Sequence, residues 1–257
     1  MKNDVIDEAE QRFEGTVYMY LDPCSARNFF MHWILAAKDG RHFVIDEWPN
    51  RYDVIPGIGM MDAWATPGTG KQFDGKPGPA QDDLGWSLLQ YKQEIARVEG
   101  WECYKEIAAP EEIKAWDQHG PKRREIMDRF MDARFGNVEA LGEGGRRTLF
   151  DEFDDIGLTF QETTADGRDT VDDSVVILNS LLAYNTAQPA VDGFNCPKFF
   201  ITPWCENTIF AFQIWTNMCK DKGACKDALD GPRYHVLKHN EHVEPVDVRK
   251  MGGRGCY

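Results

Sequence analysis

Residues 16–22 read TVYMYLD, and residues 29–49 read FFMHWILAAKDGRHFVIDEWP. The first stretch is rich in β-branched and aromatic residues and ends at Asp-Pro, which is a strong stop for a strand. The second contains two apolar runs separated by Lys38-Asp39-Gly40-Arg41. Asp-Gly between two such runs is typical of a β-hairpin. The chain therefore opens with three predicted strands, of which the second and third pair antiparallel.

The rest of the chain is predicted to alternate helices and strands. Residues 50–85 hold four prolines and many glycines, which predict a long irregular insertion after the third strand. Apolar spacing predicts helices over 86–98, 110–118, 173–187 and 206–217 and from 226, and strands near 158–160 and 198–202. Residues 125–132 fit a strand or a helix. We expect one α/β domain over residues 1–257, a mixed sheet flanked by helices, with an N-terminal extension over 1–14 and an insertion over about 50–120.

Composition limits the classes of protein to which the chain can belong. No apolar run approaches the roughly 18 residues that cross a bilayer, and the charged N-terminus lacks the apolar centre of a signal peptide. The seven scattered cysteines form no CxxC pair, which indicates reduced thiols in a cytoplasm. A net charge of −14 disfavours tight nonspecific DNA binding, but it suits a site that concentrates carboxylates around divalent cations.

Three groups of acidic residues lie where a site would form. Asp22 ends the first strand, and residues beyond strand carboxyl ends line the ligand crevice of open α/β sheets. Asp132 follows an apolar segment, and Asp227 and Asp230 are spaced to share one face of a helix. Singly, each has an ordinary explanation as a turn, a helix end or a solvated helix start. Together, carboxylates from separate elements are the ligands that two Mg²⁺ or Mn²⁺ ions need for phosphodiester hydrolysis.

The order of six motifs resembles the nuclease domain of tailed-bacteriophage terminase large subunits. The motifs are MYLDPCSARN, DGRHFVIDEWP, MDARFGN, TLFDEFDDIGLTF, ITPWCENTI and KDALDGPRY. The resemblance implies an RNase H-like fold and a metal-dependent endonuclease that cuts concatemeric double-stranded viral DNA during genome packaging. It also implies two divalent cations, a location in the host cell cytoplasm, and three partners: a terminase ATPase domain or subunit, the small terminase subunit and the portal.

The resemblance also assigns residues. Carried over position by position, it makes Asp22, Asp132 and Asp230 catalytic and metal-binding, with Asp227 as a further ligand. Glu47, at the end of the third strand, is a weaker candidate because an acid at a strand edge has an ordinary explanation. The predicted DNA contacts are the two arginines beside predicted ligands and one basic run: Arg134, Arg233, Lys122, Arg123 and Arg124.

Two features depart from the family. Gly231-Pro232 follows Asp230 and disrupts a helix interior, so we expect the last helix to begin with Pro232 in its first turn. The Walker-like string at residues 65–72 has Ala65 and Gln72 where a P-loop needs glycine and a hydroxyl residue. We therefore expect the ATPase to be a missing domain or a separate chain.

Two other functions fit the same residues. Another RNase H-like nuclease, which cuts junctions or RNA–DNA hybrids or transfers strands as integrases do, needs the same carboxylates. A non-catalytic module of the packaging complex, docked through its acidic surface, is favoured by the net charge and by the Pro/Gly-rich insertion. The sequence leaves both alternatives open.

Overall fold

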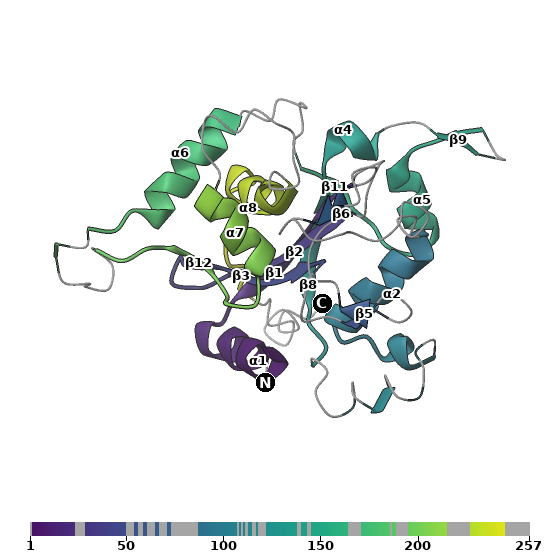
Figure 1. The fold of residues 1–257 in the computed structure, drawn as a ribbon, viewed down its shortest axis with the longest axis horizontal. Helices are drawn as coiled ribbons and strands as arrows, with labels where there is room; N and C mark the ends of the chain where they lie inside the picture. Colours follow the sequence, from purple (N-terminus) through teal and green to yellow (C-terminus); the bar gives the residue numbers. More distant parts are fainter. Residues whose placement is uncertain are drawn as a thin grey trace, which may run out of the picture.

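A six-stranded mixed sheet with helices on both faces forms the centre of the computed structural model (Figure 1). The structure describes residues 2–23, 29–49, 54–55, 59–60, 65–66, 71–72, 87–106, 108, 110, 113–114, 117, 122–137, 140–142, 145–163, 171–185, 187–188, 195–214 and 227–244. The predicted α/β class, a mixed sheet flanked by helices, is confirmed.

The three predicted strands form as expected. They are β1 (Thr16–Asp22), β2 (Phe30–Ala36) and β3 (His42–Trp48), and each pairs antiparallel with the next. Gly40, in the turn between β2 and β3, has a φ of 79°, which glycine adopts without steric cost.

Three later strands complete the sheet. They are β8 (Ile126–Met131), which settles the ambiguous segment as a strand, β11 (Gln161–Glu162) and β12 (Phe199–Ile201). β8 pairs parallel with β1, β11 with β8, and β12 with β3, so the order across the sheet is β11-β8-β1-β2-β3-β12. β1 therefore lies inside the sheet, and the carboxyl ends of β1 and β8 lie at the same edge.

Side-chain alternation along β1 divides the core into two layers. Val17, Met19 and Leu21 belong to one buried cluster, and Tyr18 and Tyr20 belong to another on the opposite face. Because successive side chains of a strand point to opposite faces, Asp22 lies on the same face as the two tyrosines.

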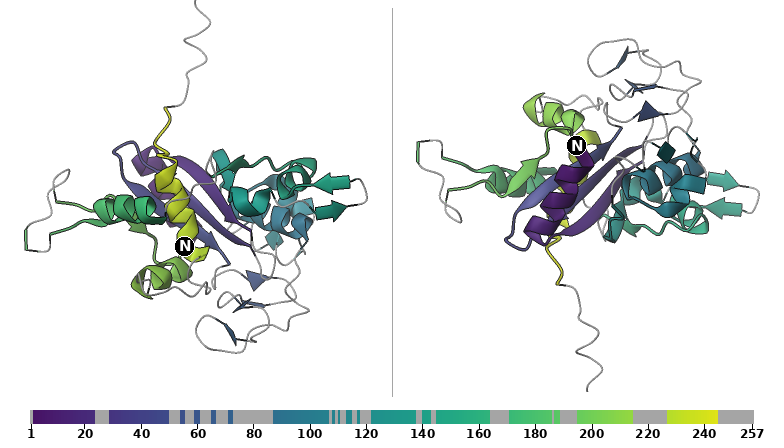
Figure 2. Two further views of the ribbon diagram at one scale, coloured as in Figure 1. Left: turned by 90° about the horizontal axis from the view of Figure 1, so that it is seen from above. Right: turned by 90° about the horizontal axis from the view of Figure 1, so that it is seen from below.

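Helices cover both clusters. The first cluster takes in residues of α1 (Lys2–Phe13), α2 (Leu88–Val98) and α5 (Leu149–Asp155). The second takes in residues of α6 (Val171–Leu182) and α8 (Asp227–Leu237), and α7 (Glu206–Ile214) packs against α8. In Figure 2, α8 crosses the strands in one view and α1 crosses them in the opposite view. Asp22 therefore faces the layer that contains α8.

The remaining described elements are short. They are η2 (Glu102–Glu106), α4 (Ala133–Gly136) and the strand pairs β4 (Val54–Ile55) with β5 (Gly59–Met60), β6 (Ala65–Thr66) with β7 (Lys71–Gln72), and β9 (Ala140–Gly142) with β10 (Gly145–Arg147). Most of the predicted insertion over 50–85, most of the predicted helix over 110–118 and the centre of the Walker-like string lie outside the described residues.

Among the helices that the structure describes, none has the length and apolar character that a membrane crossing requires. Among the described cysteines, Cys103, Cys196 and Cys205 form no disulfide.

Candidate metal centre

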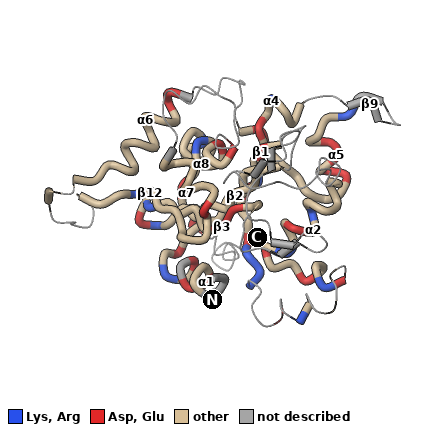
Figure 3. The backbone as a smooth tube through the Cα atoms, in the orientation of Figure 1, with Lys and Arg blue, Asp and Glu red and all other residues tan. Residues whose placement is uncertain are grey.

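Three buried aspartates from two elements meet on the α8 face of the sheet. Asp22 ends β1, and Asp227 and Asp230 lie in the first turn of α8, which packs on β1 and β2. One carboxylate oxygen of each lies within 4.8 Å of the other two, and all three side chains are buried. In Figure 3, the helix labelled α8 carries acidic positions, in red, and a basic position, in blue. The structure thus brings together three of the four predicted ligands, including both Asp227 and Asp230.

The start of α8 differs from the prediction. The helix begins at Asp227, close to the start predicted at residue 226, but Pro232 lies inside it, so the expectation that Pro232 lies in its first turn is wrong. Pro232 has no N–H to donate to the carbonyl four residues earlier, that of Ala228. His32 on β2 hydrogen-bonds the backbone of Ala228 instead, which accommodates proline at this position.

Gly231 allows α8 to approach β2 closely. A Cβ atom at this position would lie 2.2 Å from Nδ1 of His32, closer than any ordinary contact. Glycine has no such atom, so the first turn of α8 can lie directly over the strand. The Gly-Pro pair that disfavours a helix by local propensity therefore serves the position of Asp227 and Asp230 beside Asp22.

Glu47 belongs to the scaffold beneath this helix. Its carboxylate accepts hydrogen bonds from the backbone amides of Asn207 and Thr208, both at 2.9 Å, at the N-terminus of α7. Thr208 Oγ1 lies 2.6 Å from Glu47 Oε2 and 2.9 Å from His32 Nε2. Burial raises the pKa of Glu47 to about 8 and lowers that of His32 to about 3. Glu47 lies outside the group of three aspartates, and its ordinary explanation as a structural acid fits these contacts.

Asp132 lies beside the three aspartates but outside their group. It follows β8 and caps α4, where its carboxylate accepts from the backbone and side chain of Arg134. Tyr234 Oη also donates to it, at 2.7 Å. Burial acts to raise the pKa of Asp132, but the hydrogen bonds from Arg134 and Tyr234 outweigh it and hold the pKa below its ordinary value.

Tyr234 hydrogen-bonds Asp132 and lies close enough to Asp22 and Asp230 for their charges to act on its hydroxyl. It lies four residues after Asp230, on the same side of α8, and is fully buried. Burial raises its pKa well above the ordinary value, and the charges of Asp230, Asp22 and Asp132 raise it further. The sequence prediction gave Tyr234 no role, although its spacing from Asp230 was a usable signal.

The predicted DNA contacts have different surroundings. Arg134 is half-exposed beside Asp132, and Lys122 and Arg123 are exposed. Arg233 is buried, where it donates to Asp230 and, at 2.9 Å, to Ser174 Oγ, so in this structure it holds Asp230 in place.

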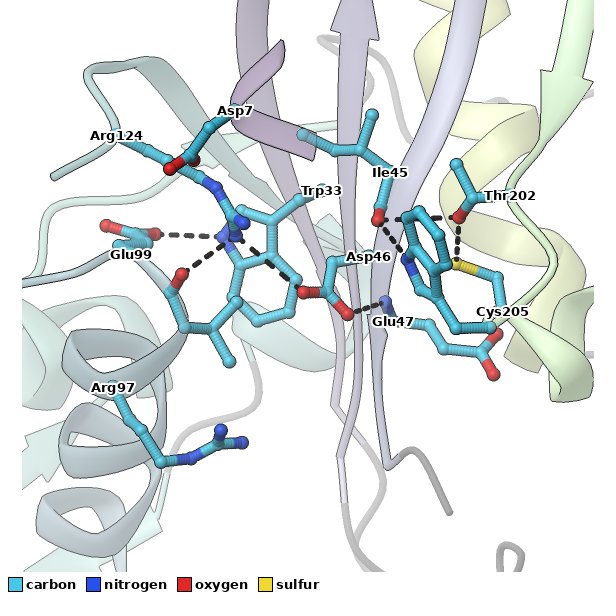
Figure 4. A network of polar contacts seen from close by, with 12 residues as sticks. Asp7, Trp33, Ile45, Asp46, Glu47, Arg97, Glu99, Arg124, Thr202 and Cys205 are labelled. Atoms are coloured by element: carbon cyan, nitrogen blue, oxygen red, sulfur yellow. Dashed lines mark hydrogen bonds and ion pairs between the residues drawn. The ribbon is translucent and has the colours of Figure 1, made fainter. Parts of the chain in front are cut away.

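Arg124 is inside the protein, and its burial corrects the prediction that it contacts DNA. It donates to the carbonyl of Val98 at 2.8 Å and pairs with Glu10 at 3.2 Å. It also pairs with Asp46 at 3.7 Å, as Figure 4 shows. Arg124 precedes β8, whereas Asp132 follows β8. The six residues of β8 span roughly 20 Å. The basic run 122–124 therefore lies at the far end of that strand from the aspartates.

The donor set suits a hard divalent cation. Carboxylate oxygens are the ligands that Mg²⁺ and Mn²⁺ favour, and three of them converge here from β1 and α8. No family model matches the chain, and neither does any curated protein or solved structure. The function must therefore be inferred from this geometry and from the motifs in the sequence.

Proposed function

We propose that the chain is a metal-dependent endonuclease of double-stranded DNA with an RNase H-like fold. The observation that carries the proposal is the convergence of Asp22, Asp227 and Asp230, whose buried carboxylates lie within 4.8 Å of one another. The strand order supports the fold. Three antiparallel strands are followed by β8, which pairs parallel with β1, and by β11, which pairs parallel with β8. The predicted ligands Asp22 and Asp132 lie at the carboxyl ends of β1 and β8.

Electrostatics supports a bound cation. Like charges a few ångströms apart in a protein interior repel strongly, because the surroundings screen them less than water does. Arg233 supplies one positive charge, through its bond to Asp230. A divalent cation at the point where the three carboxylates meet would supply two more, and oxygen ligands favour Mg²⁺ or Mn²⁺ over softer metals.

The surrounding residues suit phosphodiester hydrolysis. A bound divalent cation polarises a phosphoryl oxygen and lowers the pKa of a water molecule. Asp22, Asp227 and Asp230 would hold it, and Tyr234 orients Asp132 at the edge of the centre. Arg134 is half-exposed at that edge, where a guanidinium can bind a phosphate of DNA through two hydrogen bonds.

The biological setting follows from the motif resemblance alone. On that basis we propose that the nuclease cuts concatemeric viral DNA in the host cell cytoplasm during packaging. It would work with an ATPase domain or subunit, a small terminase subunit and a portal.

Manganese-dependent cleavage of a supercoiled plasmid tests the proposal. Asp22→Asn and Asp230→Asn are expected to reduce the rate at least 100-fold, since the loss of even a supporting residue around a metal costs roughly 10–100-fold. The matched control is Asp155→Asn, because Asp155 pairs with Arg147 outside the aspartate group. Unchanged cleavage by the Asp22 and Asp230 variants would contradict the proposal.

A substrate panel separates the proposal from the alternative nucleases. We expect faster cleavage of linear duplex DNA than of an RNA–DNA hybrid or a four-way junction of equal length. Preference for the hybrid or the junction would contradict the proposed substrate, duplex DNA, but would leave the proposed metal centre in place. Absence of cleavage together with absence of Mn²⁺ binding would favour a non-catalytic packaging module.

A further inference from the structure

The carboxylate of Asp132 is saturated with donors in this structure. Its Oδ1 accepts from the backbone amide of Arg134 at 2.9 Å and from Nε at 3.1 Å. Its Oδ2 accepts from Nη2 of Arg134 at 2.5 Å and from Tyr234 Oη at 2.7 Å. An ionised carboxylate offers about four lone-pair positions, so no position is left for a metal ion.

Asp132 nevertheless lies next to the three aspartates. Its backbone amide donates to the carbonyl of Leu21, the neighbour of Asp22, at 3.3 Å. Its side chain bonds Tyr234, whose pKa is raised in part by the charges of Asp22 and Asp230. Arg134 thus pairs with Asp132, the one predicted ligand outside the group of three aspartates.

The two partners differ in their freedom to move. The side chain of Asp132 is 3% exposed, whereas that of Arg134 is 46% exposed. Arg134 can therefore turn into solvent or toward a bound phosphate without disturbing the core. Asp132 would stay in place, because the backbone amide of Arg134 and the hydroxyl of Tyr234 still bond it.

We propose that Arg134 is a positioning residue that occupies Asp132 as a built-in cation and leaves it when DNA binds. The centre then fills in two stages. One divalent cation binds at Asp22, Asp227 and Asp230 without DNA, and a second binds tightly at Asp132 only after Arg134 has moved to a phosphate. The inference rests on the proposed function, since it concerns the same centre, and it makes DNA binding a condition for a complete site.

Counting bound Mn²⁺ by isothermal titration calorimetry tests this without measuring activity. The wild-type protein is expected to bind one ion, with a second ion bound weakly. Arg134→Gln is expected to tighten the second site by at least about tenfold, because the ion no longer displaces a charge-assisted hydrogen-bonded pair. The matched control is Arg147→Gln, which breaks the ion pair with Asp155 outside the group and should titrate like wild type.

A second arm uses the wild-type protein, so it does not depend on the folding of a variant. A phosphorothioate duplex that resists cleavage should create the second Mn²⁺ site when it is added. Equal Mn²⁺ binding by wild type and Arg134→Gln, or no second ion with the duplex, would overturn the role of Arg134 and leave the first site standing. No Mn²⁺ binding by any of the proteins would overturn the proposed function, and the inference with it.

Discussion

Replacing Gly231 with alanine perturbs the contact that seats α8 on the sheet. The new Cβ would meet His32 at 2.2 Å from Nδ1, 2.7 Å from Cγ and 3.0 Å from Cβ. His32 is fully buried and hydrogen-bonded to Thr208 and Ala228, so it cannot turn aside. Non-bonded heavy atoms pack at about 3.5 Å. Either the histidine or the first turn of α8 must therefore shift by about 1 Å to restore that separation.

The expected cost can be worked from these contacts. Overpacking a buried site costs roughly 1–3 kcal/mol, and a weakened histidine hydrogen bond costs about 1 kcal/mol. In the opposite direction, replacing glycine by alanine within a helix stabilises the folded protein by about 1 kcal/mol. We therefore expect Gly231→Ala to lower the free energy of unfolding by about 2 kcal/mol in urea titrations. Mn²⁺ should also stabilise it less than wild type in thermal melts, because Asp230 is the preceding residue.

Two further variants show whether the clash is the cause. In a His32→Ala background, Gly231→Ala should cost less, since two of the three clashing atoms are gone. Gly40→Ala should cost about 1 kcal/mol from its positive φ and leave the Mn²⁺ response intact, because nothing lies within 4 Å of that site. If Gly231→Ala matched wild type in both stability and Mn²⁺ response, this account of how α8 is seated would be refuted.

Three other outcomes follow from the buried charges. The pKa of His32 is lowered by burial from 6.5 to about 3, so the folded state binds fewer protons than the unfolded state between these values. The free energy of unfolding should fall as pH drops from 6.5 toward 3, and His32→Gln should flatten that slope in urea titrations at a series of pH values. Asp22→Asn removes one of three crowded carboxylates, so thermal melts should show a higher midpoint without metal and no gain from Mn²⁺. Arg129→Met leaves the buried Glu99 without its arginine and should cost about 3–5 kcal/mol, measured by urea titration; a loss under 1 kcal/mol would contradict that role.

Features set by local sequence could be predicted. The bounds of β1 agree with the β-branched run that stops at Pro23, and the hairpin of β2 and β3 agrees with the Asp-Gly turn. The place of Asp22 at the end of β1 could be predicted because a strand end and a rigid following residue are both visible in sequence. The segment over 125–132 could not be assigned, because only the end of β8 is fully buried and its apolar pattern is weak.

Features set by distant contacts could not be predicted. Pro232 is tolerated within α8 because His32, some 200 positions earlier, bonds Ala228. Arg124 is buried because Glu10 and Asp46 pair with it, and neither lies near it in sequence. The hydrogen bond from Tyr234 to Asp132 likewise depends on how α8 packs across the strands.

A crystal soaked in Mn²⁺ and measured at the manganese absorption edge tests the central claim most directly. The account predicts an anomalous peak bounded by Asp22, Asp227 and Asp230, within coordination distance of all three carboxylates. Without DNA it predicts no equally strong peak at Asp132, where Arg134 should remain bonded. The absence of any peak among the three aspartates at millimolar Mn²⁺ would contradict the account.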